Sequence, residues 1–375
     1  MENSVSQRIS QLRKQIAKQQ IDTFLVLIEE NRRYLSGYTG EDTQFDESAG
    51  VLIITQDELI LATDSRFELQ AQEEAPLYDV VCYKKGLVKE LPAILRQLKT
   101  KRLGIEGLRM SYNQYVKICQ ELELQNLTVK LIDTVHLVED LRVIKDDDEI
   151  KAIIKAVEVA ECDFQAFLQQ LKKGVKETDA AWELEKKMRA AGAQALSFPV
   201  ISAFGKNSAL PHAIPGNRTL NANEPVLFDW GAKLNGYCSD MTRTVTMGKP
   251  DDQFNKIFTI VYDAQQKAIE AIRPGVSSKS IDDIARNHIA EKGFKDFFGH
   301  GLGHGVGLAV HEPPSISPLI EKDITIKENM VFTVEPGIYL PDWGGIRLEN
   351  MVLVTINGIE VLNLLEMELF ISESD

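Results

Sequence analysis

Residues 224–248 read EPVLFDWGAKLNGYCSDMTRTVTMG and predict a β-hairpin around a Leu-Asn-Gly turn. Asp229 and Asp240 lie symmetrically about the bond between residues 234 and 235. Strands that pair about this point bring the two carboxylates together across the ladder. VLFDW is an apolar strand that contains an acid, and a buried carboxylate is costly unless it is paired, hydrogen-bonded or bound to a metal.

The same arrangement recurs nearer the C-terminus. Residues 329–354 read NMVFTVEPGIYLPDWGGIRLENMVLV, with two strand-like segments on either side of a loop rich in proline and glycine. Glu335 ends the first segment, and Glu349 lies at the symmetric position in the second. The sequence therefore predicts two hairpins, each carrying a pair of carboxylates.

Three histidines lie in GHGLGHGVGLAVHEPP, residues 299–314: His300, His304 and His311. His300 and His304 are four residues apart, the spacing of two metal ligands on a helix. The two glycines between them each cost a helix roughly 1 kcal/mol relative to alanine, so extended or irregular backbone is expected instead. His300 and His304 then need not bind the same metal ion.

Four carboxylates with at least one imidazole form a donor set for divalent metals, and carboxylates that bridge favour two ions. This mixture of carboxylate and imidazole donors is typical of sites for Mn, Co, Fe or Zn rather than of structural sites built from thiolates. Alternatively, each acid caps a turn or pairs with Arg243 or Arg347. That interpretation suits any single acid, whereas four acids in two matching hairpins beside a histidine cluster favour metal.

Strands that alternate with helices predict an α/β domain over residues 1–133, and 134–145 is the expected linker. A helix is expected to begin after Asp146, with Glu149 completing a capping box, and its apolar stripe ends at Gly174. The remainder, 146–375, mixes helices with strand pairs and predicts an α+β catalytic domain.

The composition excludes several classes of function. The net charge of -14 repels phosphate backbones and argues against nucleic-acid binding. The longest apolar runs, such as 24–28, are too short to span a bilayer, which predicts no membrane association. The four cysteines form no CxxC pair and the N-terminus shows no secretion signal, so a cytoplasmic protein is expected.

The motifs FDWGAKLNGYCSDMTRT, GHGLGHGVGLAVHE, TVEPGIY and GGIRLEN, in this order, resemble the metal-binding motifs of the pita-bread metallopeptidases. Within that family the chain resembles the Xaa-Pro dipeptidase (prolidase) and aminopeptidase P branch. YLSGYTG, LATDSRFELQA and LGIEG resemble the creatinase/prolidase-type N-terminal domain. The resemblance covers nearly the whole chain. It implies a pita-bread catalytic domain of α+β class, preceded by a smaller α/β domain.

The resemblance implies a set of site residues. Five are metal ligands: Asp229, Asp240, His304, Glu335 and Glu349. Asp240 and Glu349 are expected to bridge two divalent ions, with Mn or Co favoured over Zn or Fe. Three are catalytic: Glu335 in proton transfer, and His311 and His212 facing the substrate. Three more lie just outside the ligands: His300, Arg347 and Thr242. No residue is assigned to any other cofactor.

The activity implied is hydrolysis of the Xaa-Pro bond at the N-terminus of dipeptides or short proline-containing peptides, by a homodimer. The alternative within the family is an aminopeptidase P that acts on longer Xaa-Pro-Yaa peptides. Ser315 favours it, because some dipeptidases of this branch have an arginine near this position that binds the dipeptide carboxylate. A non-catalytic peptide-binding module of the same fold is the alternative of a different class; it predicts eroded ligands, and this chain keeps all five.

Overall fold

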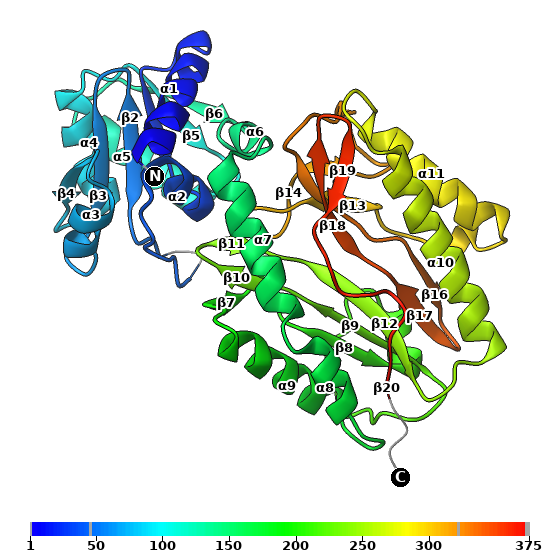
Figure 1. Ribbon diagram of the computed structural model, residues 1–375. Coiled ribbons are helices and arrows are strands. Elements are labelled where there is room, and N and C mark those ends of the chain that lie inside the picture. The colour runs from blue at the N-terminus through cyan, green and yellow to red at the C-terminus, as the bar shows by residue number, and fades with distance from the viewer. Residues whose placement is uncertain (1, 45–46, 321–322, 372–375) are drawn as a thin grey trace. The chain divides into compact units, whose positions relative to one another are not determined.

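The computed structural model describes residues 2–44, 47–320 and 323–371, and the chain forms two compact units, Met1–Arg142 and Val143–Asp375 (Figure 1). The division falls within the segment 134–145, where a short helix, α6 (Glu139–Arg142), forms. The predicted limits of the linker stay a prediction, and the last four residues of the predicted catalytic domain lie outside the described residues. Among the residues described, no helix is both long and apolar enough to cross a membrane.

A six-stranded sheet forms the centre of the first unit, in the order β4-β3-β2-β1-β5-β6. Its strands are β1 (Thr23–Val26), β2 (Val51–Thr55), β3 (Leu59–Thr63), β4 (Asp79–Cys82), β5 (Arg102–Glu106) and β6 (Lys130–Thr134). β2 runs antiparallel to both of its neighbours, and the other neighbouring pairs are parallel. Parallel strands require crossover connections, which the intervening helices provide.

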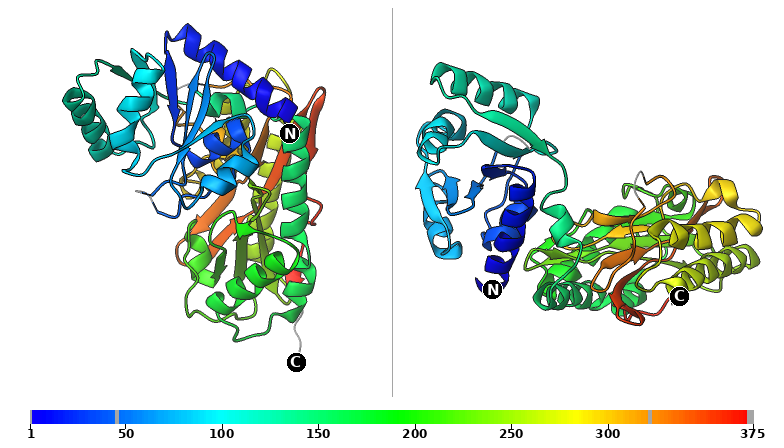
Figure 2. Two further views of the ribbon diagram at one scale, coloured as in Figure 1. Left: turned by 90° about the vertical axis from the view of Figure 1, so that its left-hand side faces the viewer. Right: turned by 90° about the horizontal axis from the view of Figure 1, so that it is seen from above.

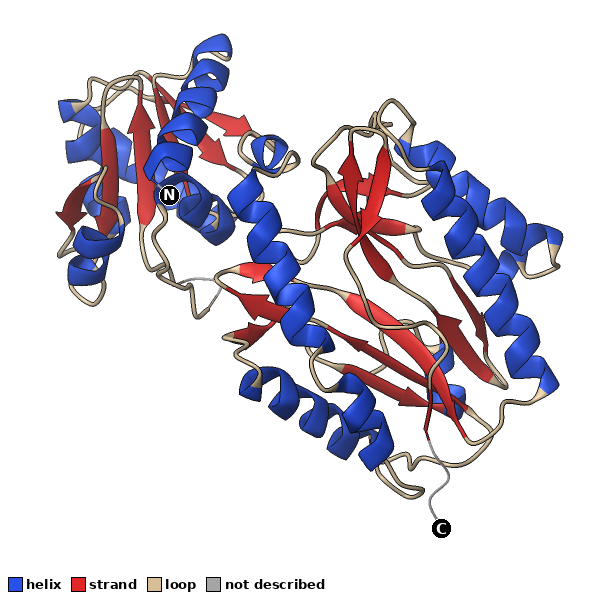
Figure 3. Cartoon of the chain, viewed as in Figure 1, coloured by secondary structure: helices blue, strands red, loops and turns tan. Residues whose placement is uncertain are grey.

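Helices cover both faces of this sheet (Figure 3). They are α1 (Glu2–Lys18), α2 (Glu29–Ser36), α3 (Glu68–Glu74), α4 (Leu87–Gln97) and α5 (Tyr112–Leu124). Leu91 of α4 and Ile118 of α5 belong to one apolar cluster with Leu25 and Ile53 of the sheet. Since neighbouring strand residues point to opposite faces, Phe24 and Leu52 face the other side, where α1 and α2 lie. The α/β class predicted for this unit is confirmed.

The second unit begins with the predicted capping box. Asp146 accepts hydrogen bonds from the first turn of α7 (Asp147–Glu161), and the Glu149 carboxylate accepts one from the Asp146 backbone amide. The prediction of one helix continuing to Gly174 was wrong. The chain breaks at Asp163, whose φ of 59° is left-handed, and α8 (Phe164–Gln170) follows. After the break, the rings of Phe164 and Phe167 both pack edge-on against Phe228.

The catalytic unit contains two groups of strands with helices on their outer faces (Figures 1 and 2). The first sheet has the order β20-β12-β9-β8 and packs against α7, α8 and α9 (Glu177–Ala190). Its strands are β8 (Ile201–Phe204), β9 (Pro225–Trp230), β12 (Met241–Met247) and β20 (Phe370–Ile371). A three-stranded sheet beside it contains β7 (Ala195–Leu196), β10 (Ala232–Leu234) and β11 (Tyr237–Cys238).

The second group packs against α10 (Asp252–Ala271) and α11 (Ser278–Glu291). Its five-stranded sheet has the order β14-β13-β15-β18-β19. These strands are β13 (Gly303–Gly305), β14 (Glu312–Ile316), β15 (Val331–Val334), β18 (Asn350–Thr355) and β19 (Gly358–Val361). The hairpin of β16 (Gly337–Leu340) and β17 (Gly344–Arg347) extends from it. The predicted α+β class of this unit is confirmed.

Candidate metal centre

The first acidic hairpin forms, but the predicted register was wrong by two residues. Asp229 of β9 lies opposite Thr242 of β12, not opposite Asp240. The turn is the two-residue Asn235-Gly236 with positive φ at both positions, which moves its centre by one residue. A shift of two residues keeps every side chain on its predicted face, so Asp240 still points to the same side of the ladder as Asp229.

The second acidic hairpin has the predicted register. Val334 of β15 lies opposite Asn350 of β18, and Gly337 of β16 lies opposite Arg347 of β17. Both pairings place Glu335 and Glu349 across from each other, between the two ladders. The Glu335 amide donates to the carbonyl of Leu302, so this acid lies next to the histidine-containing segment.

His304 lies on extended backbone, as the glycines around it predict. It is the central residue of β13, with Ser315 of β14 opposite. A Cβ on Gly303 would lie 1.9 Å from the Thr333 carbonyl oxygen, and one on Gly305 would lie 2.2 Å from the Pro313 carbonyl oxygen. Only glycine allows this close approach, which holds His304 between two neighbouring strands.

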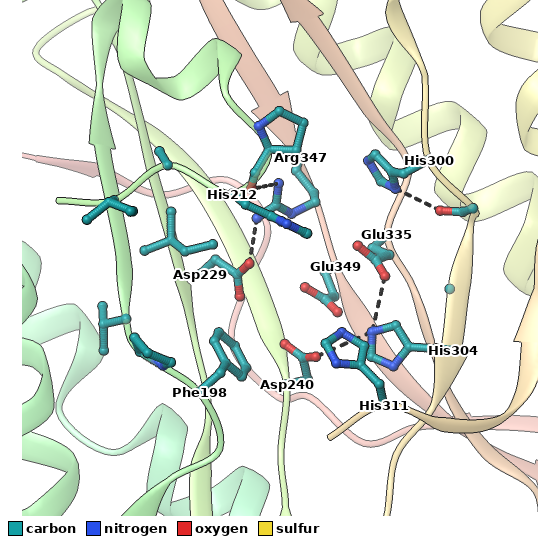
Figure 4. A pocket seen from close by; sticks show the side chains of 18 of the residues that line it. Phe198, His212, Asp229, Asp240, His300, His304, His311, Glu335, Arg347 and Glu349 are labelled. Atoms are coloured by element: carbon teal, nitrogen blue, oxygen red, sulfur yellow. Dashed lines mark hydrogen bonds and ion pairs between the residues drawn. The ribbon is translucent and has the colours of Figure 1, made fainter. Parts of the chain in front are cut away.

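The acids and histidines meet in one cavity of about 530 Å³ (Figure 4). His304 Nε2 lies 3.6 Å from Asp240 Oδ2 and 3.4 Å from Glu335 Oε1. Ligand atoms of Asp240, His304 and Glu349 lie within 4.8 Å of one another, the one such cluster found among the described residues. All predicted site residues except Thr242 line this cavity.

The charges of these acids fit divalent cations. Burial and the charge of Glu349 raise the pKa values of Asp240 and Glu335 well above their usual range. Burial and the charge of Asp229 raise the pKa of Glu349 itself to about 8. Asp229 Oδ1 is buried and, among the described residues, has no hydrogen-bond partner. Carboxylates that repel one another inside a cleft need positive charge between them, and divalent ions supply it.

Arg347 and Thr242 hold the acids in place. Arg347 Nη2 donates to Asp229 Oδ2, and Arg347 Nε donates to Thr242 Oγ1 at 3.0 Å. The Thr242 hydroxyl donates in turn to Glu349 Oε2 at 2.6 Å. Thr333 bonds both sides of the cluster, accepting from the His304 amide and donating to Glu335 Oε1 at 3.3 Å. No pattern in the sequence singles out Thr333.

His300 lies behind the cluster and reaches it through a tyrosine. Its Nδ1–H donates to the Gly301 carbonyl, which leaves Nε2 to accept from the Tyr339 hydroxyl at 2.8 Å. Tyr339 also accepts from Arg347 Nη1 at 3.0 Å. Sequence reasoning missed Tyr339. The sequence signal that could have pointed to Tyr339 is Gly345, the residue opposite it in the β16–β17 hairpin, which leaves room for the tyrosine ring.

Burial favours the neutral form of His304 and His311. Burial and the nearby His311 lower the pKa of His304 to about 4, so its ring nitrogen keeps the lone pair that a metal ligand needs. Burial is the main cause that lowers the pKa of His311, and the nearby His212 lowers it further. The rings of His304 and His311 lie 4.2 Å apart between centroids. His311 and His212 line the cavity from outside the acid cluster.

Residues 151–356 match the model of metallopeptidase family M24, and residues 8–144 match the Creatinase/Prolidase N-terminal domain. The chain belongs to metallopeptidase family M24. An Xaa-Pro dipeptidase of Pyrococcus furiosus, which is 38% identical over 365 residues, aligns over 97% of this chain and 100% of its own length. Membership of M24 implies divalent metal ions, and the acid cluster has the donors for them.

Solved M24 structures resemble the whole chain. An Xaa-Pro dipeptidase from Bacillus anthracis superposes with a TM-score of 0.91 at 34% identity, covering 98% of this chain and 99% of the other. An X-Pro aminopeptidase from Thermotoga maritima gives 0.86 at 36% identity, covering 96% and 99%. The predicted family and its two-domain fold are confirmed. The structural relatives thus include one named as an Xaa-Pro dipeptidase and one named as an X-Pro aminopeptidase.

Proposed function

We propose that this M24 peptidase is a metal-dependent exopeptidase that hydrolyses the Xaa-Pro bond at the N-terminus of dipeptides and short peptides. The observation that carries the proposal is the convergence of four carboxylates from two hairpins, three of them buried, and His304 on one cavity. Two ions, Mn or Co, would be held by the five proposed ligands: Asp229, Asp240, His304, Glu335 and Glu349. When bound, such ions make water nucleophilic near neutral pH and polarise a carbonyl.

The chain's own residues would handle the proton and the substrate oxygen. Glu335, whose pKa is raised by burial and by Glu349, can hold the proton released by the attacking water and pass it to the proline nitrogen. His311, exposed towards the cavity and neutral, can donate a hydrogen bond to the carbonyl oxygen as it gains charge. His212 can bind the same oxygen from the opposite rim.

One wall of the cavity supports proline as the residue after the cleaved bond. Phe198, Val200, Ala213 and Pro215 make an apolar surface beside the acids. A pyrrolidine ring needs apolar contacts and no hydrogen-bond acceptor, because its nitrogen carries no N–H in the peptide. The same wall would gain nothing from a polar side chain at this position.

A specific observation favours the alternative, aminopeptidase P. Among the described residues that line the cavity, Arg347 is the only permanent cation, and it is bound to Asp229. A dipeptide carboxylate would therefore lack a free cationic partner among the described residues of this cavity. A second cavity shares part of the apolar wall, Phe198 to Val200 and Pro215, and extends to Trp182. It offers room for residues beyond proline.

The deciding experiment compares Ala-Pro with Ala-Pro-Ala at equal concentration, with Mn²⁺ or Co²⁺ supplied. The dipeptidase proposal predicts faster cleavage of Ala-Pro, and comparable or faster cleavage of the tripeptide would assign aminopeptidase P instead. A chelator should abolish both activities. Absence of turnover with either metal would favour the non-catalytic binding module. The homodimer and the cytoplasmic location implied by the resemblance are further proposals, and the molar mass in solution tests the first.

A further inference from the structure

A buried lysine precedes the first helix of the catalytic unit. Lys145, in LRVIKDDDEI, has a fully buried side chain, and its backbone amide donates to the Asn329 carbonyl at 2.9 Å. Its Nζ donates to Glu312 Oε1 at 2.9 Å, and the Glu312 side chain is only 4% exposed. The two residues are 167 positions apart in the sequence. None of the catalytic steps proposed above uses this ion pair.

Glu312 fills the inside of the turn that carries His311. Its second oxygen, Oε2, accepts from the Ala309 amide at 3.3 Å. A Cβ on Gly307 would lie 2.3 Å from Glu312 Oε1, so the carboxylate closes against bare backbone. Gly305 lies opposite Glu312, after a register shift that follows His304. The carboxylate thus fixes the segment 305–312 at several points.

His311 is the direct neighbour of Glu312, and the two side chains face different ways. Glu312 is the first residue of β14 and points to Lys145, while His311 is exposed and lines the cavity. His311 lies in the bend that directly precedes β14, so fixing the Glu312 side chain restrains the backbone that carries the His311 ring. The His311 ring then lies 4.2 Å from that of His304.

We propose that Lys145 is a positioning residue for His311 and acts through Glu312. A buried ion pair contributes little net stability, because the cost of removing both charges from water offsets their attraction. Its effect here is on geometry: the Lys145 backbone amide is anchored on the Asn329 carbonyl, and the Lys145 ammonium fixes the Glu312 carboxylate and so the turn. The part of this inference that is tested by turnover rests on the proposed function. The position of the His311 ring can be tested without it.

The test uses the full chain with the double substitution Lys145→Met and Glu312→Gln, which removes both charges and keeps the volume. Bound Mn²⁺ and the KM for Ala-Pro should stay within about twofold of wild type. The kcat should fall about tenfold or more, because displacement of a group by about 1 Å can cost 10²-fold. In the His311→Ala background the same double substitution should cause no further loss, since both changes remove one interaction. Lys145→Arg, which keeps a cation, should lose less.

A second measurement does not depend on turnover. In NMR spectra of the metal-free protein, ring signals assigned to His311 by their loss in His311→Ala should shift or broaden in the double variant, while those of His136 stay in place. Unchanged His311 signals would overturn the proposal, as would an equal loss of kcat in the His311→Ala background. If the double variant does not fold, Glu312→Asp carries the same expectations. If wild type does not cleave Xaa-Pro peptides, the proposed function fails and the NMR result alone decides the role of Lys145.

Discussion

The two units of this chain both bury carboxylates, and they satisfy them in opposite ways. Glu106, at the end of β5 in the first unit, is surrounded by donors. Its Oε2 accepts from the amides of Leu27 and Ile28 at 2.5 and 2.6 Å, and its Oε1 accepts from Asn31 Nδ2 at 2.7 Å. In the catalytic unit the acids face one another, and burial together with the charge of Glu349 raises the pKa values of Asp240 and Glu335.

A raised pKa alone does not distinguish the two regions. Burial raises the pKa of Glu106 to about 7, and burial together with Asp229 raises that of Glu349 to about 8. The two regions differ in the groups that surround each carboxylate. A carboxylate saturated by N–H donors ties β1 to β5 and needs nothing further, whereas acids that repel one another beside a cavity need a cation. The first is a structural site and the second is a site for ligands.

The largest expected effect follows from removing one of the clustered acids. Asp240→Asn should lower kcat/KM about 10³-fold, equivalent to about 4 kcal/mol of transition-state stabilisation, because a proposed bridging ligand is lost. Metal content should fall with it. The metal-free variant should be no less stable than metal-free wild type, since a repelling charge is gone. Glu106→Gln is the matched control and should keep both activity and metal; equal loss in both variants would contradict the division.

The second-largest expected effect is a pH dependence of the free energy of unfolding, caused by Glu106 in the first unit. Because the folded state raises the pKa of Glu106 from 4.5 to about 7, folding favours its protonated form. This contribution is complete below about pH 4.5 and is lost as pH rises through 7, a change of about 3 kcal/mol at most. The free energy of unfolding of wild type should therefore fall relative to Glu106→Gln between pH 5 and 8. A constant difference across this range would show that Glu106 does not titrate there.

A smaller effect is expected for complete removal of the Glu106 side chain. Glu106→Ala leaves the amides of Leu27 and Ile28 without acceptors and should lower the free energy of unfolding by about 2 kcal/mol, measured with urea at pH 6. The kcat per folded molecule should not change. A loss of kcat would mean that this carboxylate serves the active site after all.

The smallest effect should come from a hydroxyl that supports a ligand. Thr242→Val removes the hydrogen bond to Glu349 and should weaken metal binding about tenfold. Thr246→Val, a buried change four residues further along β12 on the same face, should leave metal affinity as in wild type. Calorimetric titration of metal into both variants compares them. Equal weakening in both would assign the effect to the strand and not to the ligand.

Much of the fold was predictable because local patterns determine it. The apolar runs at β2 and β5, the helix after Asp146 and both acidic hairpins follow from side-chain periodicity and turn residues. The Leu-Asn-Gly segment allowed more than one turn, and the wrong choice shifted the register by two residues. The break at Asp163 was missed because the apolar stripe continues across it, and the change of direction comes from packing on Phe228.

The site was predictable where chemistry leaves a local trace, as with an acid in an apolar strand or a histidine among glycines. Tyr339, Thr333 and the pair of Lys145 and Glu312 leave no such trace, because their roles depend on contacts between distant segments. Glu106 shows the converse. An acid that ends an apolar strand resembles a ligand in sequence, and only the three donors around it identify its structural role.

The central claim is that the clustered acids hold two divalent ions. Chelator-treated protein titrated with Mn²⁺ tests it most directly, with bound metal and Ala-Pro hydrolysis followed in the same samples. Wild type should bind two equivalents of Mn²⁺ per chain, activity should return with them, and Asp240→Asn should bind less. Full hydrolysis by the metal-free protein, or no bound metal in wild type with Mn²⁺ or Co²⁺, would contradict it.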